Sequence, residues 1–252
     1  MSTPINVAIL GARGRMGAAA VKAVNDAPDL NLVAELGRGD ALETILEAGA
    51  THVIDLTVPD QSEANVLFAV RNGLHAVVGT TGWDEAKLER LRAELAEHPE
   101  VGVLIAPNFA LGSVLATAFA ARAAKYFESV EIVELHHPNK VDAPSGTAAR
   151  TAELIGQARR EAGVPDSPDA TTSDPDGARG AVIEGVHVHA VRLRGLVAHQ
   201  EVLLGGEGEQ LTIRHDSYDR VSFMPGVLLG VREAANHPGL THGLDGYLEL
   251  GL

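Results

Sequence analysis

Cysteine is absent from the 252 residues of the sequence. Disulfide bonds and thiolate metal ligands are therefore excluded. The sequence also lacks any apolar run close to the ~18 residues that a membrane-spanning helix requires, so we expect no membrane partner. No charged and then apolar leader precedes the first apolar segment, and the expected location is therefore the cytoplasm.

Positive charge is scarce, because 20 lysine and arginine residues face 34 aspartate and glutamate residues, for a formal net charge of −14. This balance argues against binding to the phosphate backbone of nucleic acids, so no nucleic-acid partner is expected. An anionic small molecule remains compatible with it, because the local field in a cleft can oppose the global charge. Hydrophobic residues make up 45% of the chain and the mean hydropathy is +0.05, as is typical of a globular protein with a sizeable core.

Short apolar runs alternate with helical patterns in the first half of the chain. The expected strands are 5–10, 30–36, 52–58, 75–80 and 101–106. The expected helices are 18–24, 61–72 and 84–95. This alternation predicts an α/β domain with a Rossmann-type, doubly wound parallel sheet, in which ligands bind beyond the carboxyl ends of the strands.

A glycine-rich turn, GARGRMG at 11–17, connects the first expected strand to the first helix. Its spacing is a close variant of the dinucleotide-binding pattern, where glycine lets the backbone approach a pyrophosphate at the helix N-terminus. Two more polar or glycine-rich turns, 79–82 and 106–109, follow strands of the same sheet. Because the carboxyl ends of parallel strands meet at one edge, the three turns predict a cofactor crevice. The alternative is that they are ordinary turns.

The acid that ends the second strand bears on the choice of cofactor. Glu35 lies about 20 residues beyond the glycine-rich turn, where a carboxylate binds the adenine ribose hydroxyls and favours NAD over NADP. Arg13, Arg15 and Arg38 oppose this preference, because guanidinium groups pair well with phosphate. The acid and the arginines together predict use of both NADH and NADPH. The alternative is that these arginines are surface residues that bind no cofactor.

The pattern changes after residue 107. The expected elements are helix 111–127, strand 129–135, helix 148–162, a surface loop or lid at 164–180, strands 186–193, 196–204 and 210–215, and helix 223–235. Four strands with few helices predict a smaller α+β domain with a four-stranded mixed sheet. The predicted domains are 1–107, completed by 216–252, for dinucleotide binding, and 108–215 for substrate binding and oligomerisation.

The loop at 134–147 concentrates the polar chemistry of the second half. Two adjacent imidazoles, His136 and His137, are followed by the ammonium of Lys140. Ser145 then predicts a helix start, whose first N–H groups form a site for a carboxylate or phosphate. A histidine and a lysine beside that site could donate a proton to a bound anion. The alternative is a solvated loop with an ordinary helix cap.

Three further histidines raise the question of a metal site. His187 and His189 lie two residues apart on one expected strand, and His199 lies on a strand that we expect to be its neighbour. Such a trio could bind zinc, but no acidic residue is spaced to complete the site. We therefore expect half-buried strand histidines and no metal.

The motifs of the chain are GARGRMG at 11–17, GTTG at 79–82, APNF at 106–109 and ELHHPNKVDAPSGTA at 134–148. Together they resemble the 4-hydroxy-tetrahydrodipicolinate reductase family, nearly end to end. The resemblance implies reduction of 4-hydroxy-tetrahydrodipicolinate to tetrahydrodipicolinate with NADH or NADPH, releasing water, in the diaminopimelate route to lysine. It also implies a homotetramer that joins through the sheets of the substrate domain.

The resemblance further implies roles for single residues. His136 would be the proton donor and Lys140 the other candidate, while His137, Gly146 and Thr147 would bind the dicarboxylate substrate. The implied cofactor-binding residues are Gly11, Ala12, Arg13, Gly14, Arg15, Met16, Glu35, Gly79, Thr80, Thr81, Ala106, Pro107, Asn108 and Phe109. Many relatives carry arginine where this chain has Leu36, so selectivity for NADP is not implied.

Two other functions stay open on the sequence. One is a different two-domain NAD(P)-dependent dehydrogenase, although the absence of cysteine excludes semialdehyde dehydrogenases that form a thioester. The other is a dinucleotide-sensing regulator without turnover. Such a regulator has no need of His136 and Lys140 beside a helix N-terminus.

Overall fold

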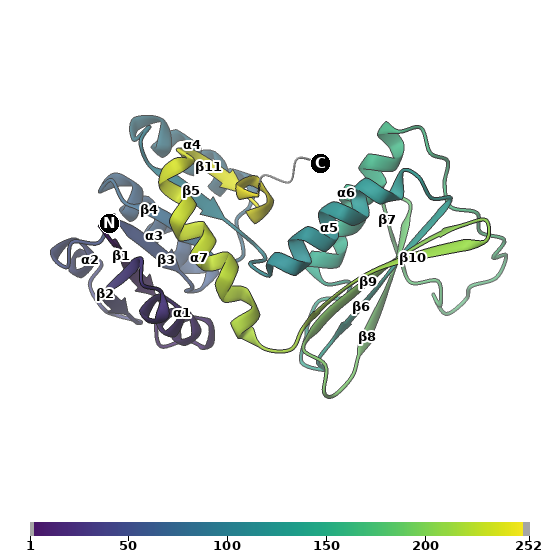
Figure 1. The fold of residues 1–252 in the computed structure, drawn as a ribbon, viewed down its shortest axis with the longest axis horizontal. Helices are drawn as coiled ribbons and strands as arrows, with labels where there is room; N and C mark the ends of the chain where they lie inside the picture. Colours follow the sequence, from purple (N-terminus) through teal and green to yellow (C-terminus); the bar gives the residue numbers. More distant parts are fainter. Residues whose placement is uncertain (1–2, 249–252) are drawn as a thin grey trace. The chain divides into compact units, whose positions relative to one another are not determined.

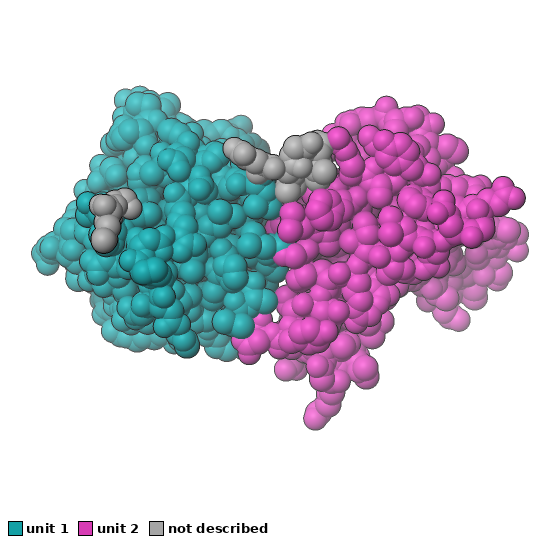
Figure 2. All heavy atoms as spheres, in the orientation of Figure 1, with its two compact units in different colours: residues 1–111, 220–250 teal, residues 112–219, 251–252 magenta. Residues whose placement is uncertain are grey.

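The computed structural model describes residues 3–248, which fold into two compact units. Figure 2 colours them separately. The first unit comprises the described residues up to 111 and from 220 onward, and the second comprises residues 112–219. Each unit is built around its own sheet (Figure 1). No helix within the described residues is long and apolar enough to cross a membrane.

The first unit contains a six-stranded sheet with the order β11-β5-β4-β3-β1-β2. All neighbouring strands run parallel, so the prediction of a doubly wound parallel sheet is confirmed. The strands are β1 (Ile5–Leu10), β2 (Leu30–Leu36), β3 (His52–Asp55), β4 (His75–Val78), β5 (Gly102–Ile105) and β11 (Gly239–His242). β11 is absent from the predicted strands because its four residues, GLTH, contain neither a regular alternation nor an apolar run.

Helices cover both faces of this sheet. They are α1 (Arg15–Asp26), α2 (Glu43–Glu47), α3 (Pro59–Arg71), α4 (Glu85–Glu97) and α7 (Met224–Glu233), with 3-10 turns at Arg220–Phe223, Ala234–Asn236 and Leu244–Tyr247. Because side chains alternate along a strand, Val78 and Ile105 pack with α3 and α4, whereas Val77 and Leu104 face α7. Gly230 permits this approach of α7, since a Cβ there would lie 2.9 Å from Leu104 and 3.0 Å from Val77.

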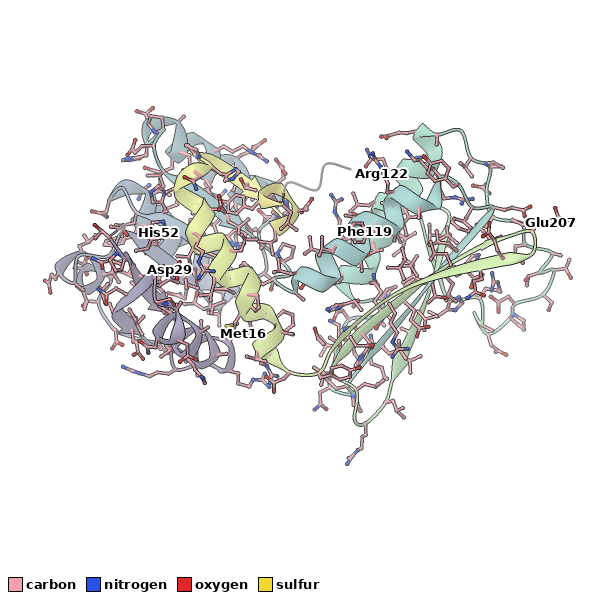
Figure 3. All side chains as sticks on the ribbon, in the orientation of Figure 1. Met16, Asp29, His52, Phe119, Arg122 and Glu207 are labelled. Atoms are coloured by element: carbon pink, nitrogen blue, oxygen red, sulfur yellow. The ribbon has the colours of Figure 1, made fainter. Side chains whose placement is uncertain are left out.

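Two histidines are paired inside this unit, at the start of β3 and β4. His52, labelled in Figure 3, is opposite His75 in the strand register, and their ring centroids lie 4.7 Å apart. Burial, together with a smaller effect of the charge of His75, lowers the pKa of His52 to about 4. Burial lowers the pKa of His75 as well. Both rings are therefore neutral in the folded protein near pH 7.

This pair should make the fold sensitive to acid. An unfolded histidine takes up its proton near pH 6.5, whereas folded His52 does so only near pH 4. Stability is therefore full above about pH 6.5 and falls as the pH drops toward 4, by about 3 kcal/mol for this group. Urea denaturation at a series of pH values from 7 to 4 measures how the free energy of unfolding depends on pH. The His52→Gln variant should lose less stability over this range than the wild type. An equal slope in the variant would assign the acid sensitivity to other groups.

The second unit contains a five-stranded mixed sheet with the order β10-β9-β6-β8-β7. Its elements are α5 (Leu111–Ala124), β6 (Ser129–His136), α6 (Gly146–Glu161), β7 (Ala181–Ile183), β8 (Val186–Arg192), β9 (Ala198–Gly206) and β10 (Glu209–Ser217). The four predicted strands are present, and β7 is an addition. β7 has only three residues and joins β8 through a tight turn at Glu184 and Gly185, both with positive φ.

One face of this sheet carries the core of the unit. Strand alternation turns Val130 and Ile132 of β6, with Val202 of β9, toward α5 and α6, which lie together beside the sheet in Figure 1. The other face carries Val133, Leu135 and Leu203, which are only partly buried. The alternation thus leaves apolar side chains on the face that α5 and α6 do not cover.

Candidate functional site

The glycine-rich turn follows β1 and begins α1. Gly11 has φ +80°, and a Cβ there would lie 2.6 Å from the carbonyl oxygen of Leu56. A Cβ at Gly17 would lie 2.0 Å from the carbonyl oxygen of Gly11, so both positions require glycine. Gly14 is the N-cap of α1 and has no side chain with which to bond the first-turn N–H groups. The turn therefore forms a backbone cradle that fits a pyrophosphate at a helix N-terminus.

The end of β2 lies beside this turn. Glu35 pairs with Ile9 in the strand register and is exposed. Arg13 donates to a carboxylate oxygen of Asp40 at 3.0 Å, and the N–H of Gly37 donates to the same oxygen at 2.8 Å. The structure thus brings one guanidinium of the turn to the end of β2, where an adenine ribose binds in this fold. Because Asp40 already partly neutralises Arg13, a 2′-phosphate would compete with Asp40 for it.

The two remaining turns follow β4 and β5. A Cβ at Gly79 would lie 2.9 Å from the ring of Phe109, so these turns meet at the same sheet edge. Thr80 is buried and donates to Asp55 at 3.3 Å, and Asn108 accepts from the N–H of Ala110 at 2.9 Å. A small pocket beside them is lined by Thr80, Thr81, Gly82, Trp83, Ile105, Pro107 and His242. The predicted cofactor residues of the first unit therefore gather at the carboxyl ends of the strands.

The second group of predicted residues lies in the other unit, where β6 ends and α6 begins. His136 is the last residue of β6, and its Nδ1 lies 2.5 Å from a carboxylate oxygen of Glu134. Glu134 is fully buried, and its other oxygen accepts from the N–H of Ser145 at 3.0 Å. Arg192, the last residue of β8, donates to both oxygens of Glu134, at 2.8 and 2.9 Å. The imidazole is therefore fixed against a buried ion pair.

The ammonium and the helix N-terminus share one carboxylate. Lys140 donates to one oxygen of Asp142 at 2.5 Å, and the N–H of Gly146 donates to the other at 3.2 Å. Ser145 caps α6, since its hydroxyl accepts from the N–H of Ala148 at 3.2 Å. Thr147, in the first turn of α6, is half-buried. The predicted anion-binding groups are thus placed to hold a carboxylate, and Asp142 supplies one.

His137 lies beside this arrangement with a polar atom unused. Its Nδ1 is buried and has no hydrogen-bond partner within residues 3–248. Buried polar atoms are nearly always paired in folded proteins. His137 lies in the same loop as Lys140, whose N–H donates to the carbonyl oxygen of His137 at 3.2 Å, so its unpaired nitrogen is a candidate contact for a polar ligand of this loop.

The environment sets the charge of these groups. Burial lowers the pKa of His136, against the effect of Glu134, which raises it. Burial would raise the pKa of Glu134, yet hydrogen bonds from Arg192 and His136 hold it below its usual value. The Lys140 ammonium lowers the pKa of Asp142. Both carboxylates therefore stay ionised, and His136, a residue type that often acts as a general acid, is held against one of them.

The trio of strand histidines does not come together. β6 lies between β8 and β9, so the expectation that His199 neighbours the strand of His187 and His189 is wrong. His189 pairs with Glu131 at 2.7 Å, and Nδ1 of His187 donates to the carbonyl oxygen of Arg179 at 2.7 Å. The described residues contain no group of three or more histidine, aspartate or glutamate side chains that could hold a metal.

Several residues of these sites were not predicted from the sequence. Glu134 is part of the ELHH motif. It could have been recognised in the sequence as a charged residue at a strand position that faces the core. Arg192 joins it only through the strand pairing of β6 with β8, whereas Asp142 belongs to the same motif and contacts Lys140 and Gly146 within the loop. His242 belongs to the unpredicted β11, and Trp83 directly follows the GTTG turn.

Family comparisons cover almost the whole chain. Residues 5–109 match the family model "Dihydrodipicolinate reductase, N-terminus", and residues 112–248 match "Dihydrodipicolinate reductase, C-terminus". A 4-hydroxy-tetrahydrodipicolinate reductase of Streptomyces griseus subsp. griseus is 63% identical over 98% of both chains. One of Nocardia farcinica is also 63% identical, over 98% of this chain and 99% of its own.

Solved structures agree with these matches. The dipicolinate-bound dihydrodipicolinate reductase of Paenisporosarcina sp. TG-14 has a TM-score of 0.87 at 38% identity, covering 98% of this chain and 100% of that one. The myo-inositol 2-dehydrogenase of Lactobacillus plantarum has a TM-score of 0.62 at 12% identity, covering 97% of this chain and 93% of that one. The second similarity shows a shared fold alone.

Proposed function

Since the chain belongs to the dihydrodipicolinate reductase family, we propose that it reduces 4-hydroxy-tetrahydrodipicolinate to tetrahydrodipicolinate, releasing water, in lysine biosynthesis. The observation that carries the proposal is the placement of His136 against the buried Glu134, on the strand that leads into Lys140 and the N-terminus of α6. This arrangement combines a proton donor with groups that hold a carboxylate. A dinucleotide-sensing regulator would need neither.

The cofactor would be NADH or NADPH, held by the three turns of the first unit. The Gly11–Gly17 turn fits the pyrophosphate, because it leads directly into the N-terminus of α1 and its glycines permit a turn so tight that added Cβ atoms at Gly11 and Gly17 would collide with backbone atoms. Glu35 would bind the adenine ribose, and Arg13 the 2′-phosphate of NADPH in competition with Asp40. When bound, the nicotinamide supplies the hydride. No metal takes part in the proposed reaction.

The substrate is a cyclic imine with two carboxylates. Lys140 and the N–H groups of Gly146 and Thr147 would hold one carboxylate, taking the place that Asp142 now fills. The unpaired Nδ1 of His137 would contact the substrate as well. The ammonium of Lys140 and the N–H groups of the helix N-terminus place positive charge beside the substrate, which draws electron density from the ring and so favours its reduction. The proton then comes from His136, or from Lys140 as the alternative donor.

The dicarboxylate site can be tested with dipicolinate, the ligand bound in the Paenisporosarcina structure. Lys140→Met removes one charged hydrogen-bond donor, so its dissociation constant for dipicolinate should rise by about 10-fold or more. Titration calorimetry with NADH present measures the change. Lys125→Met, which removes a lysine just after α5, is the matched control and should bind as the wild type does. Equal affinity in all three proteins would remove Lys140 from the substrate site.

The enzyme would act as a cytoplasmic homotetramer whose small-molecule partner is the dicarboxylate substrate, with no nucleic-acid or membrane partner. Val133, Leu135 and Leu203 support assembly through the second sheet, because they lie on the face away from α5 and α6. Such a face suits burial against a second copy of the chain. Sedimentation equilibrium measures the assembly.

A further inference from the structure

Glu134 is a buried carboxylate with every acceptor position in use. One oxygen accepts from the N–H of Ser145 at 3.0 Å and from Arg192 at 2.9 Å. The other accepts from Arg192 at 2.8 Å and faces Nδ1 of His136 at 2.5 Å. Its side chain is 0% exposed. A buried charge persists only where it is paired and hydrogen-bonded to this extent, so Glu134 is ionised and can only accept.

Arg192 connects the carboxylate to the loop that carries Lys140. Its guanidinium binds Glu134 through two parallel hydrogen bonds, a geometry that fixes both side chains. It also donates to the backbone carbonyl oxygen of Asp142 at 2.7 Å. One residue at the end of β8 thus ties together the strand of His136, the loop after it and, through Glu134, the start of α6.

The pair dictates which nitrogen of His136 is available. Because Glu134 can only accept, Nδ1 must carry a hydrogen and donate it. Nε2 is then the atom that gains and loses the proton. The charged groups acting on the ring are Glu134 from its own strand, Lys140 from the loop and Arg192 from β8.

We propose that Glu134 and Arg192 are positioning residues for the reaction, which orient His136 so that Nε2 delivers the proton and which set the charge of the ring. This inference rests on the proposed function. The two residues act on the ring in opposite directions, since the carboxylate favours the imidazolium and the guanidinium opposes it. Burial of Glu134 removes solvent that would otherwise weaken both effects.

A merely structural role is the competing explanation, in which the ion pair only holds β6, β8 and α6 together. The chain provides a matched comparison on the same strand. Glu131 contacts His189 at 2.7 Å and pairs with Arg179 at 2.6 Å, on the opposite face of the sheet. It repeats the glutamate–histidine–arginine grouping away from Lys140 and the start of α6.

The test uses the full-length variants Glu134→Gln, Arg192→Gln and, as control, Glu131→Gln, each checked for folding by thermal unfolding. The titration of His136 is followed by NMR in the free protein. Loss of the carboxylate should lower the midpoint by about one pH unit, and loss of the guanidinium should raise it by a similar amount. Glu131→Gln should leave the titration midpoint of His136 within about 0.3 pH unit of the wild-type value. Opposite shifts are the result that a structural role cannot give.

Kinetics supply the second measurement. For Glu134→Gln, kcat at pH 8 should fall about 10-fold or more with little change in KM, and the pH at which kcat/KM declines should move toward acid. Glu131→Gln should stay within about 2-fold of the wild type. An unmoved His136 midpoint in both Glu134→Gln and Arg192→Gln would overturn the proposal. If one variant does not fold, the direction of the shift in the other decides.

The NMR measurement needs no substrate. If the wild type lacked reductase activity, the proposed function would fail, while the titration would still show whether Glu134 and Arg192 control the ring. Conversely, an active wild type with an unmoved midpoint would overturn only the positioning role.

Discussion

Replacing His136 by alanine should lower kcat by a factor of about 100 or more, as the loss of a general acid does. KM for NADH should change little, because His136 lies outside the unit that carries the glycine-rich cradle. The physical reason is the fixed imidazole, which presents a proton at Nε2 while Glu134 holds Nδ1. Steady-state kinetics with saturating NADH measure the effect directly.

His189→Ala is the matched control for this prediction. His189 also contacts a glutamate of β6, but on the opposite face of the sheet. Its loss should leave kcat within a few-fold of the wild type. If His136→Ala were equally mild, Lys140 would become the proton donor, and Lys140→Met should then show the large loss instead.

Replacing Arg159 by methionine should lower the free energy of unfolding of the second unit by about 3 kcal/mol or more, because it leaves several buried carbonyl groups without donors. Arg159 is only 6% exposed, although it is charged. It donates to the carbonyl oxygens of Ala124 (3.1 Å), Phe127 (2.8 Å), Glu128 (2.9 Å) and Pro165 (2.8 Å). These groups lie at the end of α5, in the segment between α5 and β6, and in the loop after α6. Urea denaturation followed by circular dichroism measures the loss.

The next residue provides the control. Arg160 lies on the same helix, is exposed and pairs with Glu184. Exposed ion pairs contribute little, so Arg160→Met should change the free energy of unfolding by less than about 1 kcal/mol. Similar losses for the two variants would mean that helix propensity, and not the bonds to the carbonyl groups, explains the effect.

The N-terminal fold is readable from the sequence because its signals are local. Buried parallel strands appear as continuous apolar runs, and Gly17 is needed for a contact within the turn itself, with the carbonyl oxygen of Gly11. The loop after β6 is readable for the same reason, since Ser145 caps α6 as expected. Two strands were not predicted: β7 has only three residues, and β11, with the sequence GLTH, lacks the continuous apolar residues that mark the equally short β4.

The remaining site residues depend on strand order, which local patterns do not contain. Arg192 reaches Glu134 because β8 pairs with β6 in parallel, with His136 opposite Arg192 in the register. The same pairing inserts β6 between β8 and β9 and so separates His199 from His187. A parallel pair requires a long crossover, here through α6 and the loop that follows it, and its register is set by packing across the whole unit.

The central claim is reduction of 4-hydroxy-tetrahydrodipicolinate, and a coupled assay tests it most directly. The substrate is generated in situ from pyruvate and aspartate semialdehyde by its synthase, and nicotinamide absorbance is followed with NADH and NADPH in parallel. Cofactor consumption should require the complete mixture, and the two rates give the preference that Glu35, Arg13 and Asp40 set between them. No consumption with either cofactor, from a protein that binds NADH, would contradict the reductase.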